Sequence, residues 1–269
     1  MTIAQKKASI VGEHRLKTGA EFKASLDDGR LLWVNGKKID KVTDNPALSA
    51  GVDLLASMFD DQFTEEHADA TTYYDKESKA IVSRSWQIPR TKQDLEDRRK
   101  MIEYTSLKTG GTFGRPPDLA PSIAVGLYAF LPTFKAKKSL TDGISPDFAE
   151  NIEKYMVYGH ESNMTASESL TGPQADRSNP KVAEASLLKV KSVEKDGIRI
   201  YGAKTVGSIS AQANEIFFTN LGGIQDKPAE AFIWGSVTVN PEGIHLISLQ
   251  MASNPGRGPL HPPHATPLH

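Results

Sequence analysis

The chain of 269 residues contains no cysteine, and this absence removes several kinds of chemistry from it. Without thiols there is no disulfide, no thiolate nucleophile and no cysteine-ligated zinc or iron–sulfur centre, and the composition fits a reducing cytoplasm. The formal net charge is only -1, which gives no electrostatic reason to expect nucleic acid or an anionic membrane as a partner. No apolar run approaches the length that spans a bilayer, and we expect no signal peptide in the charged segment 1–16.

Helical patterns dominate the first 160 residues. A capping-box sequence, Thr91 to Asp94, and an Asn45-Pro46 pair both indicate helix starts. The segment 119–134 is apolar nearly all round, which predicts a helix buried between neighbours. The predicted helices cover 16–26, 46–63, 91–108, 119–134 and a stretch that begins at Ser145-Pro146.

Strand patterns are few in this half. Asn35-Gly36 lies between two short strand-like runs, 30–34 and 37–42, and this pair tolerates the positive φ angles of a type I′ hairpin turn. A further extended segment is predicted over 80–88. The first 160 residues therefore read as a mainly helical domain with a β-hairpin near 30–42.

After Pro180 the hydrophobic period falls towards two, which predicts a β-domain over 161–253. The predicted strands are 187–193 and 198–201, joined by an Asp196-Gly197 turn, then 215–219, 231–239 and 243–248. Segment 254–269 holds five prolines and three histidines without any periodic pattern, so we expect a disordered tail. Its histidines lack a scaffold and predict no metal site.

The segment Ser167–Ser178 concentrates hydroxyl groups, an amide and a Gly-Pro break where the helical pattern gives way to strands. Such junctions commonly carry cofactor or substrate sites. The alternative is an ordinary interdomain loop whose hydroxyls cap helices and turns.

The segment Gly110–Asp118 is a second candidate. Its glycines would let the backbone approach a ligand, and the helix that follows would direct its N-terminal amides at an anion. Arg115 adds a bidentate donor. The alternative is a tight turn between helices in which Arg115 pairs with Asp118.

These segments occur in an order that resembles the 4-hydroxyphenylacetate 3-hydroxylase family over roughly 16–248. The motifs that carry the resemblance are L-K-T-G-A-E-F-K-A-S-L-D-D-G-R (16–30), W-V-N-G-K-K-I (33–39), T-D-N-P-A (43–47), I-P-R-T-K-Q-D-L (88–95), G-R-P-P-D (114–118), F-A-E-N-I-E-K-Y (148–155), L-T-G-P-Q-A-D-R-S (170–178), D-G-I-R-I-Y-G-A-K (196–204) and A-N-E-I (213–216).

The resemblance implies an α+β architecture: an acyl-CoA-dehydrogenase-like N-terminal helical domain over 1–160, then an antiparallel β-barrel-like domain. It also implies the oxygenase component of a two-component monooxygenase. Such a protein hydroxylates a small phenolic or other aromatic substrate, using O2 and reduced FAD (FADH2) from a separate flavin reductase. Family members form homo-tetramers.

By the same resemblance, Arg115 lies near the substrate and the flavin, and the flavin face is formed by Thr171, Gln174, Arg177 and Ser208. The chain departs from the family at two positions. Leu119 replaces a usual tyrosine, and Glu168 aligns with a histidine that contacts the substrate. Glu168 is therefore a candidate base towards a different substrate, or a helix cap.

Family members are roughly twice as long, and the C-terminal helical bundle has no counterpart in these residues. This leads to the expectation of a truncated or frame-shifted member whose segment 254–269 replaces the bundle. Two alternatives to the oxygenase stay open. One is a non-catalytic remnant that acts at most as a binding module. The other is a lyase related to 4-hydroxybutyryl-CoA dehydratase, which the lack of cysteine ligands disfavours.

Overall fold

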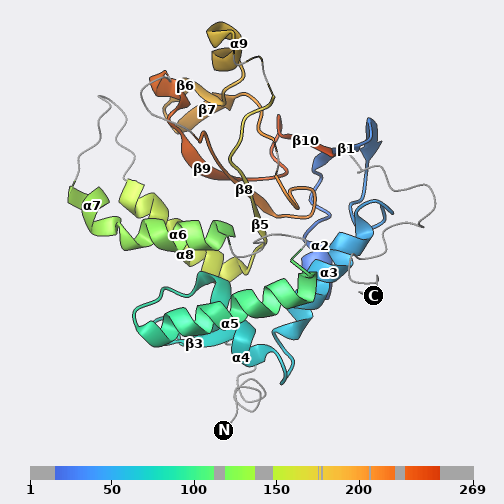
Figure 1. The fold of residues 1–269 in the computed structure, drawn as a ribbon, viewed down its shortest axis with the longest axis vertical. Helices are drawn as coiled ribbons and strands as arrows, with labels where there is room; N and C mark the ends of the chain where they lie inside the picture. Colours follow the sequence, from blue (N-terminus) through green and yellow to red (C-terminus); the bar gives the residue numbers. More distant parts are fainter. Residues whose placement is uncertain are drawn as a thin grey trace.

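The computed structural model describes residues 16–111, 119–136, 148–174, 176, 178–205, 207–221 and 228–248. The helices lie in two groups (Figure 1). The first group is α2 (Gly19–Ala24), α3 (Ser49–Asp61), α4 (Ala68–Thr71), the 3-10 turn η1 (Arg84–Trp86) and α5 (Lys92–Thr109). The second is α6 (Leu119–Ala129), α7 (Leu131–Ala136) and α8 (Phe148–Ser162), and two short elements, α9 (Pro180–Ala185) and η3 (Ala229–Ala231), accompany the later strands.

The strands of the described ranges form four small sheets. β1 (Leu31–Val34) pairs with β2 (Lys37–Ile39) and with β10 (His245–Ser248), and β3 (Thr72–Asp75) pairs with β4 (Ala80–Ser83). A third sheet has the order β5 (Ala166–Ser169), β8 (Glu215–Thr219), β9 (Trp234–Thr238), and β6 (Lys189–Glu194) pairs with β7 (Gly197–Tyr201). None of these sheets closes into a barrel, so the structure bears out a mixed helix-and-sheet fold and not the expected barrel-like closure.

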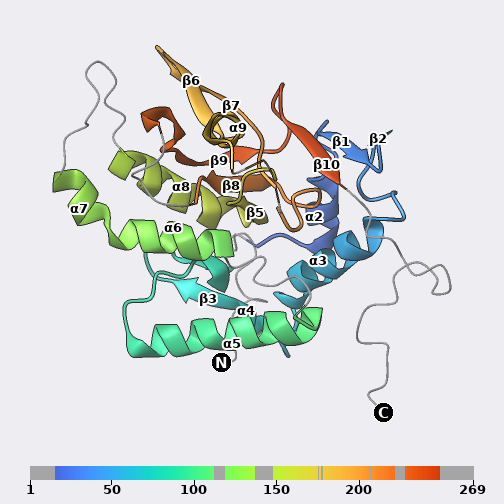
Figure 2. The same ribbon diagram turned by 45° about the horizontal axis from the view of Figure 1, so that its top comes forward.

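The molecule is layered around helices α6 and α8. Figures 1 and 2 both show these helices between α5 on one side and the β5–β8–β9 sheet on the other. The core between them contains Trp86 from η1, Ala124 from α6, Met156 from α8 and Phe217 from β8. Helix α8 therefore contacts both the helical layer and the sheet that carries the predicted site residues.

Residues far apart in sequence meet in the sheet that contains β1. β1 pairs in parallel with β10, with Leu32 opposite Leu246, although more than 200 residues separate them in the chain. Arg30, at the start of this sheet, is buried and donates hydrogen bonds to the carbonyl oxygens of Ala211 and Ala213, both at 2.9 Å. Its guanidinium also pairs with Asp28. The N-terminal hairpin is thus packed against the second half of the chain.

The predicted turns, helix caps and hairpins are confirmed where they depend on residues that are neighbours in the sequence. Asn35 and Gly36 have φ angles of 49° and 77°, as the hairpin turn between β1 and β2 requires. The Thr91–Asp94 capping box forms at the start of α5, with reciprocal side-chain-to-backbone hydrogen bonds. The β6–β7 hairpin and strands β8 and β10 also lie where the period-two pattern predicts them.

Several predicted boundaries are wrong. Helix α3 begins at Ser49 and not at Pro46, because residues 46–48 form a separate turn in which Leu48 and Ser49 both donate to the Asn45 carbonyl. The predicted helix 119–134 is two helices, since Pro132 has no N–H and ends the α6 ladder. α6 also buries one face only, and Phe130 beside it is exposed.

The region 72–88 differs from the sequence prediction as well. The extended segment ends at Ser83 and continues as the 3-10 turn η1, and strand β3 was not predicted. The run Thr71-Thr72-Tyr73-Tyr74 has the β-branched and aromatic character of a strand. A turn follows in which the Asp75 carboxylate accepts from the Ser78 amide at 2.8 Å. These two signals together identify the β3–β4 hairpin.

The expected tail over 254–269 lies outside the described residues. Among the helices that the structure does describe, none combines the length and the apolar character needed to cross a bilayer.

Candidate functional site

Strand β5 presents a face of hydroxyl groups. Ser167 and Ser169 point to the same side because alternate residues of a strand share a face. The Ser167 hydroxyl donates to the Ser208 carbonyl at 2.8 Å and lies 2.8 Å from the Ser210 hydroxyl. The Ser169 hydroxyl donates to the Thr205 carbonyl at 3.2 Å. Hydrogen bonds from this face therefore hold residues 205 and 207–210, which we call the 205–210 segment, against the strand.

The same pairing continues just beyond β5. Thr171 and Thr205 form an isolated antiparallel bridge in which the Thr205 amide donates to the Thr171 carbonyl at 3.0 Å. The Thr171 hydroxyl donates to the Thr205 carbonyl at 3.0 Å, and the Thr205 hydroxyl donates to the Gly172 carbonyl at 2.9 Å. These bonds set the position of Thr171 relative to the 205–210 segment.

The 205–210 segment contains a strained residue. Ile209 has a φ of 58°, a conformation that a β-branched side chain rarely adopts. Its side chain is nevertheless buried in the core cluster with Phe22 and Leu32. Strain of this kind concentrates at functional sites, where the surrounding packing maintains it. Here the strained residue directly follows Ser208, whose own side chain is exposed.

The structure brings some of the predicted residues together. Thr171 and Ser208 lie at the two ends of one hydrogen-bonded unit, formed by β5 and the 205–210 segment. Gln174 is exposed three residues after Thr171. Arg115 and Arg177 lie outside the described residues, as does most of the glycine-rich segment 110–118. The segment 167–178 is thus not wholly a loop, because its first three residues belong to β5.

Glu168 lies on the opposite side of β5 from this hydroxyl face. It alternates with Ser167 and Ser169 and shares the side of Ala166, which belongs to the core cluster with Trp86 and Phe217. Glu168 is half-buried and pairs in register with Phe217 of β8. The candidate base therefore lies on the face of β5 opposite to the Ser167 and Ser169 hydroxyls, which bond to the segment that carries Ser208.

A buried glutamate that sequence reasoning missed lies on the face of Glu168. Glu215 of β8 is 5% exposed and pairs with Ala166 in the parallel ladder, so it is the diagonal neighbour of Glu168. The Ser236 hydroxyl donates to its carboxylate at 2.5 Å. Tyr155 of α8 donates to Ser236 at 3.2 Å. This network ties helix α8 to the sheet.

The Glu215 carboxylate affects the pKa of two tyrosines of α8. Burial raises the pKa of the Tyr155 hydroxyl, and the negative charge of Glu215 raises it further. Burial also raises the pKa of Tyr158, again with the Glu215 charge as the second cause. Both phenols are therefore neutral donors at physiological pH. A glutamate at the start of a predicted strand, in the A-N-E-I motif, was the available sequence signal for this network.

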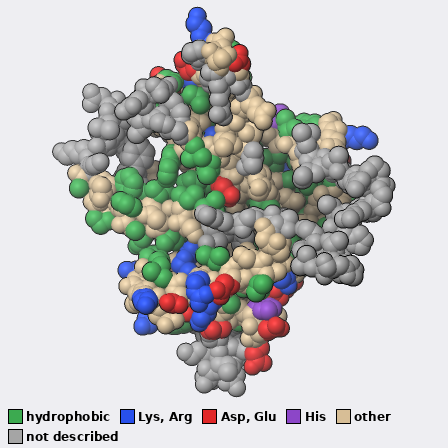
Figure 3. Space-filling view, viewed as in Figure 1, with side chains coloured by type: hydrophobic (Ala, Val, Ile, Leu, Met, Phe, Trp, Pro, Cys, Tyr) green, Lys and Arg blue, Asp and Glu red, His purple; other side chains and the backbone are tan. Residues whose placement is uncertain are grey.

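Charged and hydrophobic side chains are distributed unevenly over the molecule. Figure 3 shows basic and acidic side chains gathered over α5, whereas hydrophobic side chains gather over α6 and the region above it. Within the described ranges, no group of three or more histidine or acidic side chains could hold a metal ion. Among the described residues near β5, the exposed polar side chains include the hydroxyls of Thr171 and Ser208 and the amide of Gln174. The Thr171 hydroxyl already donates to the Thr205 carbonyl, so it is left as an acceptor, whereas the Gln174 amide can both donate and accept.

Comparison of the sequence with known proteins identifies a protein family that matches most of the chain. The family described as "4-hydroxyphenylacetate 3-hydroxylase N terminal" matches residues 18–266. The FADH(2)-dependent monooxygenase TftD of Burkholderia cepacia is 28% identical over 253 residues, which are 91% of this chain and 48% of that protein. The oxygenase component of a 4-nitrophenol 4-monooxygenase/4-nitrocatechol 2-monooxygenase from Rhodococcus opacus is 27% identical over 93% of this chain and 48% of its own length. The chain thus spans about half the length of these relatives.

Solved structures share the fold. The oxygenase component of 4-hydroxyphenylacetate 3-monooxygenase, solved in complex with FAD and 4-hydroxyphenylacetate, superposes with a TM-score of 0.76 at 23% identity, over 86% of this chain and 46% of that one. An oxygen-tolerant archaeal 4-hydroxybutyryl-CoA dehydratase from N. maritimus superposes with a TM-score of 0.74 at 16% identity, over 86% and 45%. The fold is therefore common to an oxygenase and a lyase, and fold alone does not choose between them.

Proposed function

This chain belongs to the 4-hydroxyphenylacetate 3-hydroxylase family, and from that membership we propose that it carries the flavin-facing side of a reduced-FAD-dependent oxygenase. The substrate class is a phenolic or related aromatic compound, and O2 is the co-substrate. The relatives named above as monooxygenases support this assignment. Reduced FAD, when bound, supplies the electrons for oxygen activation, and the protein holds and orients the reactants.

The observation that carries the proposal is the hydrogen-bonded unit of β5 and the 205–210 segment. It holds Thr171 and Ser208 in a fixed relation, and the strained Ile209 indicates that packing imposes this turn. Preorganised polar groups of this kind bind a rigid ring with a smaller ordering cost. We assign Thr171, Gln174, Arg177 and Ser208 to the flavin, and Arg115 to the junction of flavin and substrate.

We propose Glu168 as a general base towards the substrate. Its place supports this role, because Glu168 is half-buried on the face of β5 that also lies beside the buried Glu215 of β8, and a carboxylate is a common general base. With Leu119 at the start of α6, the substrate pocket also lacks a tyrosine hydroxyl that family hydroxylases usually have. The protein would then hold the phenolic oxygen of its preferred substrate with other groups than those that family hydroxylases use for 4-hydroxyphenylacetate.

The remaining organisation follows from the same proposal. The expected units are a helical domain over 1–160 and a β-domain over 161–253, with the acyl-CoA-dehydrogenase-like arrangement of the family. The expected partners are a separate flavin reductase and further copies in a homo-tetramer.

Binding of FAD tests the function directly. We expect anaerobic titration of the purified chain with reduced FAD to raise the melting temperature as the flavin concentration rises, and titration with oxidised FAD to change the flavin fluorescence. Oxidised FAD should bind more weakly. A chain that is folded by circular dichroism and binds neither form would contradict the proposed flavin site.

Thr171→Val and Ser208→Ala should each weaken FAD binding by roughly threefold to tenfold, the worth of one hydrogen bond. The matched control is Ser192→Ala on the β6–β7 hairpin, which also removes one hydroxyl but lies outside the proposed site. If all three variants bind FAD equally, the assignment of Thr171 and Ser208 fails even when the chain itself binds flavin.

Glu168→Gln should lower turnover of the aromatic substrate by about 100-fold, the lower range for loss of a general base. The Kd for FAD should stay within about twofold, since Glu168 lies on the other face of β5. The pH–rate profile should also lose its acidic limb. Equal activity of the glutamine variant would remove Glu168 from the mechanism.

Two other functions remain testable alternatives. A non-catalytic binding module predicts no turnover of any phenol, with or without a flavin reductase. A dehydratase-like lyase has support from the shared fold, but these 269 residues offer no cysteine to ligate an iron–sulfur cluster. Hydroxylated product that depends on O2 would decide for the oxygenase over both.

A further inference from the structure

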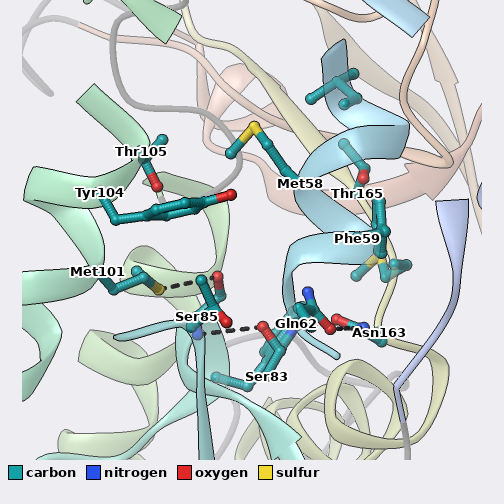
Figure 4. A pocket seen from close by; sticks show the side chains of 14 residues that line it. Met58, Phe59, Gln62, Ser83, Ser85, Met101, Tyr104, Thr105, Asn163 and Thr165 are labelled. Carbon is teal, nitrogen blue, oxygen red and sulfur yellow. Dashed lines mark hydrogen bonds between the residues drawn. The ribbon is translucent and has the colours of Figure 1, made fainter. Parts of the chain in front are cut away.

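A small cavity lies among the helices, next to the residues that lead into β5. It is formed between α3, α5, the segment 83–86 and the segment 163–165, and its volume is about 40 Å³. Figure 4 shows Met58 of α3 and Gln62, which directly follows that helix, on one side and Met101 and Thr105 of α5 on the other. The wall mixes apolar side chains with hydroxyl and amide groups.

One polar atom of the wall has no partner. Thr165 is fully buried, at 0% exposure, and its hydroxyl makes no hydrogen bond with any residue that the structure describes. The backbone of Thr165 is satisfied, because its amide bonds to the Asn214 side chain and its carbonyl accepts from the Asn214 amide. A buried hydroxyl without a hydrogen-bond partner lowers the stability of the folded state by roughly 1 to 3 kcal/mol. A small polar molecule that bonds to this hydroxyl would remove that cost.

Other polar groups surround the same space. The Ser85 hydroxyl donates to the sulfur of Met101 at 3.5 Å, and a thioether is a weak acceptor. Gln62 accepts from the Asn163 amide at 2.8 Å, which connects α3 to the segment before β5. A water molecule in a protein interior needs two to four such polar partners, and this wall provides them.

We propose that the cavity is a hydration site that holds one or two ordered water molecules, one of them bonded to the Thr165 hydroxyl. The volume of about 40 Å³ exceeds the roughly 10 to 15 Å³ that a cavity needs to hold one water, and each further water takes about 30 Å³. The bound water joins α3, α5 and the segment that leads into β5. It is a structural link between the helical layer and the strand that carries Glu168.

A dry cavity is the physical alternative. Apolar cavities stay empty in water and take up xenon, and six of the wall residues are apolar or sulfur-containing: Leu55, Met58, Phe59, Trp86, Met101 and Met164. The orphan hydroxyl distinguishes the two cases. Removing it stabilises a protein with a dry cavity and destabilises one in which the hydroxyl holds water.

Thr165→Val keeps the shape of the side chain and removes the hydroxyl. We expect its melting temperature to fall by roughly 2 to 4 °C in a chain of this size. Water-oxygen-17 relaxation dispersion of the purified chain should detect long-lived internal water, and at least one such molecule should be lost in the variant. The test involves no flavin, so its outcome does not depend on the proposed function.

Thr165→Ser is the matched control, because it removes a methyl group and keeps the hydroxyl. It should retain the long-lived water that the valine variant loses. A higher melting temperature for Thr165→Val would overturn the proposal. Xenon density in the cavity of crystals of the unaltered chain, with no water present, would do the same.

Discussion

Replacing Arg98 by alanine is expected to lower the free energy of unfolding by roughly 3 to 5 kcal/mol, since several buried acceptors lose a charged donor at about 1 to 3 kcal/mol each. Arg98 of α5 is 8% exposed. Its guanidinium donates to the carbonyl oxygens of Arg84, Ser85 and Gln87, at 3.1, 2.9 and 3.3 Å. It also donates to the Ser122 hydroxyl of α6 at 2.7 Å. One side chain therefore joins η1, α5 and α6.

The neighbouring Arg99 provides the control. It is exposed and pairs with Glu96 and Glu103 on the surface of the same helix, and surface ion pairs contribute only about 0 to 1 kcal/mol. Chemical denaturation of Arg98→Ala and Arg99→Ala measures the difference. Equal unfolding free energies for the two variants would show that the Arg98 contacts do not support the fold.

Replacing Gly159 by alanine is the second change with a large expected effect. A Cβ atom at this position of α8 would lie 2.4 Å from ring carbons of Trp86. Trp86 is 1% exposed, so the indole cannot move aside without displacing the core between α6 and α8. His160, next in the helix, lies 2.8 Å from the Trp86 carbonyl oxygen through its Nε2. We expect a loss of about 3 kcal/mol, at the upper end for overpacking.

Gly126→Ala is the matched substitution in a neighbouring helix. A Cβ at Gly126 of α6 meets no atom within 4 Å, and alanine is the better helix former by about 1 kcal/mol. Gly126→Ala should therefore raise the melting temperature while Gly159→Ala lowers it. A stable Gly159→Ala variant would mean that α8 docks against η1 less closely than the structure indicates. Near-UV circular dichroism of Trp86 reports that contact.

The turns and helix caps could be predicted from the sequence, because each depends only on residues that are close together in the chain. The Asn35-Gly36 turn depends only on which residues tolerate positive φ. The Thr91–Asp94 capping box depends on two side chains and two amides within four residues. Order of motifs along the chain also identified the family, which the family comparison confirmed over residues 18–266. The named flavin and substrate residues stay predictions.

Tertiary contacts determined the strand pairing and the polar networks. No local pattern predicts that β1 pairs in parallel with β10, because that pairing depends on packing between residues more than 200 positions apart. In the same way, Glu215 becomes part of a buried network only when α8 lies across β8 and β9. The face that each residue of β5 presents, Glu168 on one side and Ser167 on the other, was fixed by the pairing of Ser167 with the distant 205–210 segment. The sequence by itself thus determined the family and the turns and caps, whereas long-range packing determined which polar side chains meet.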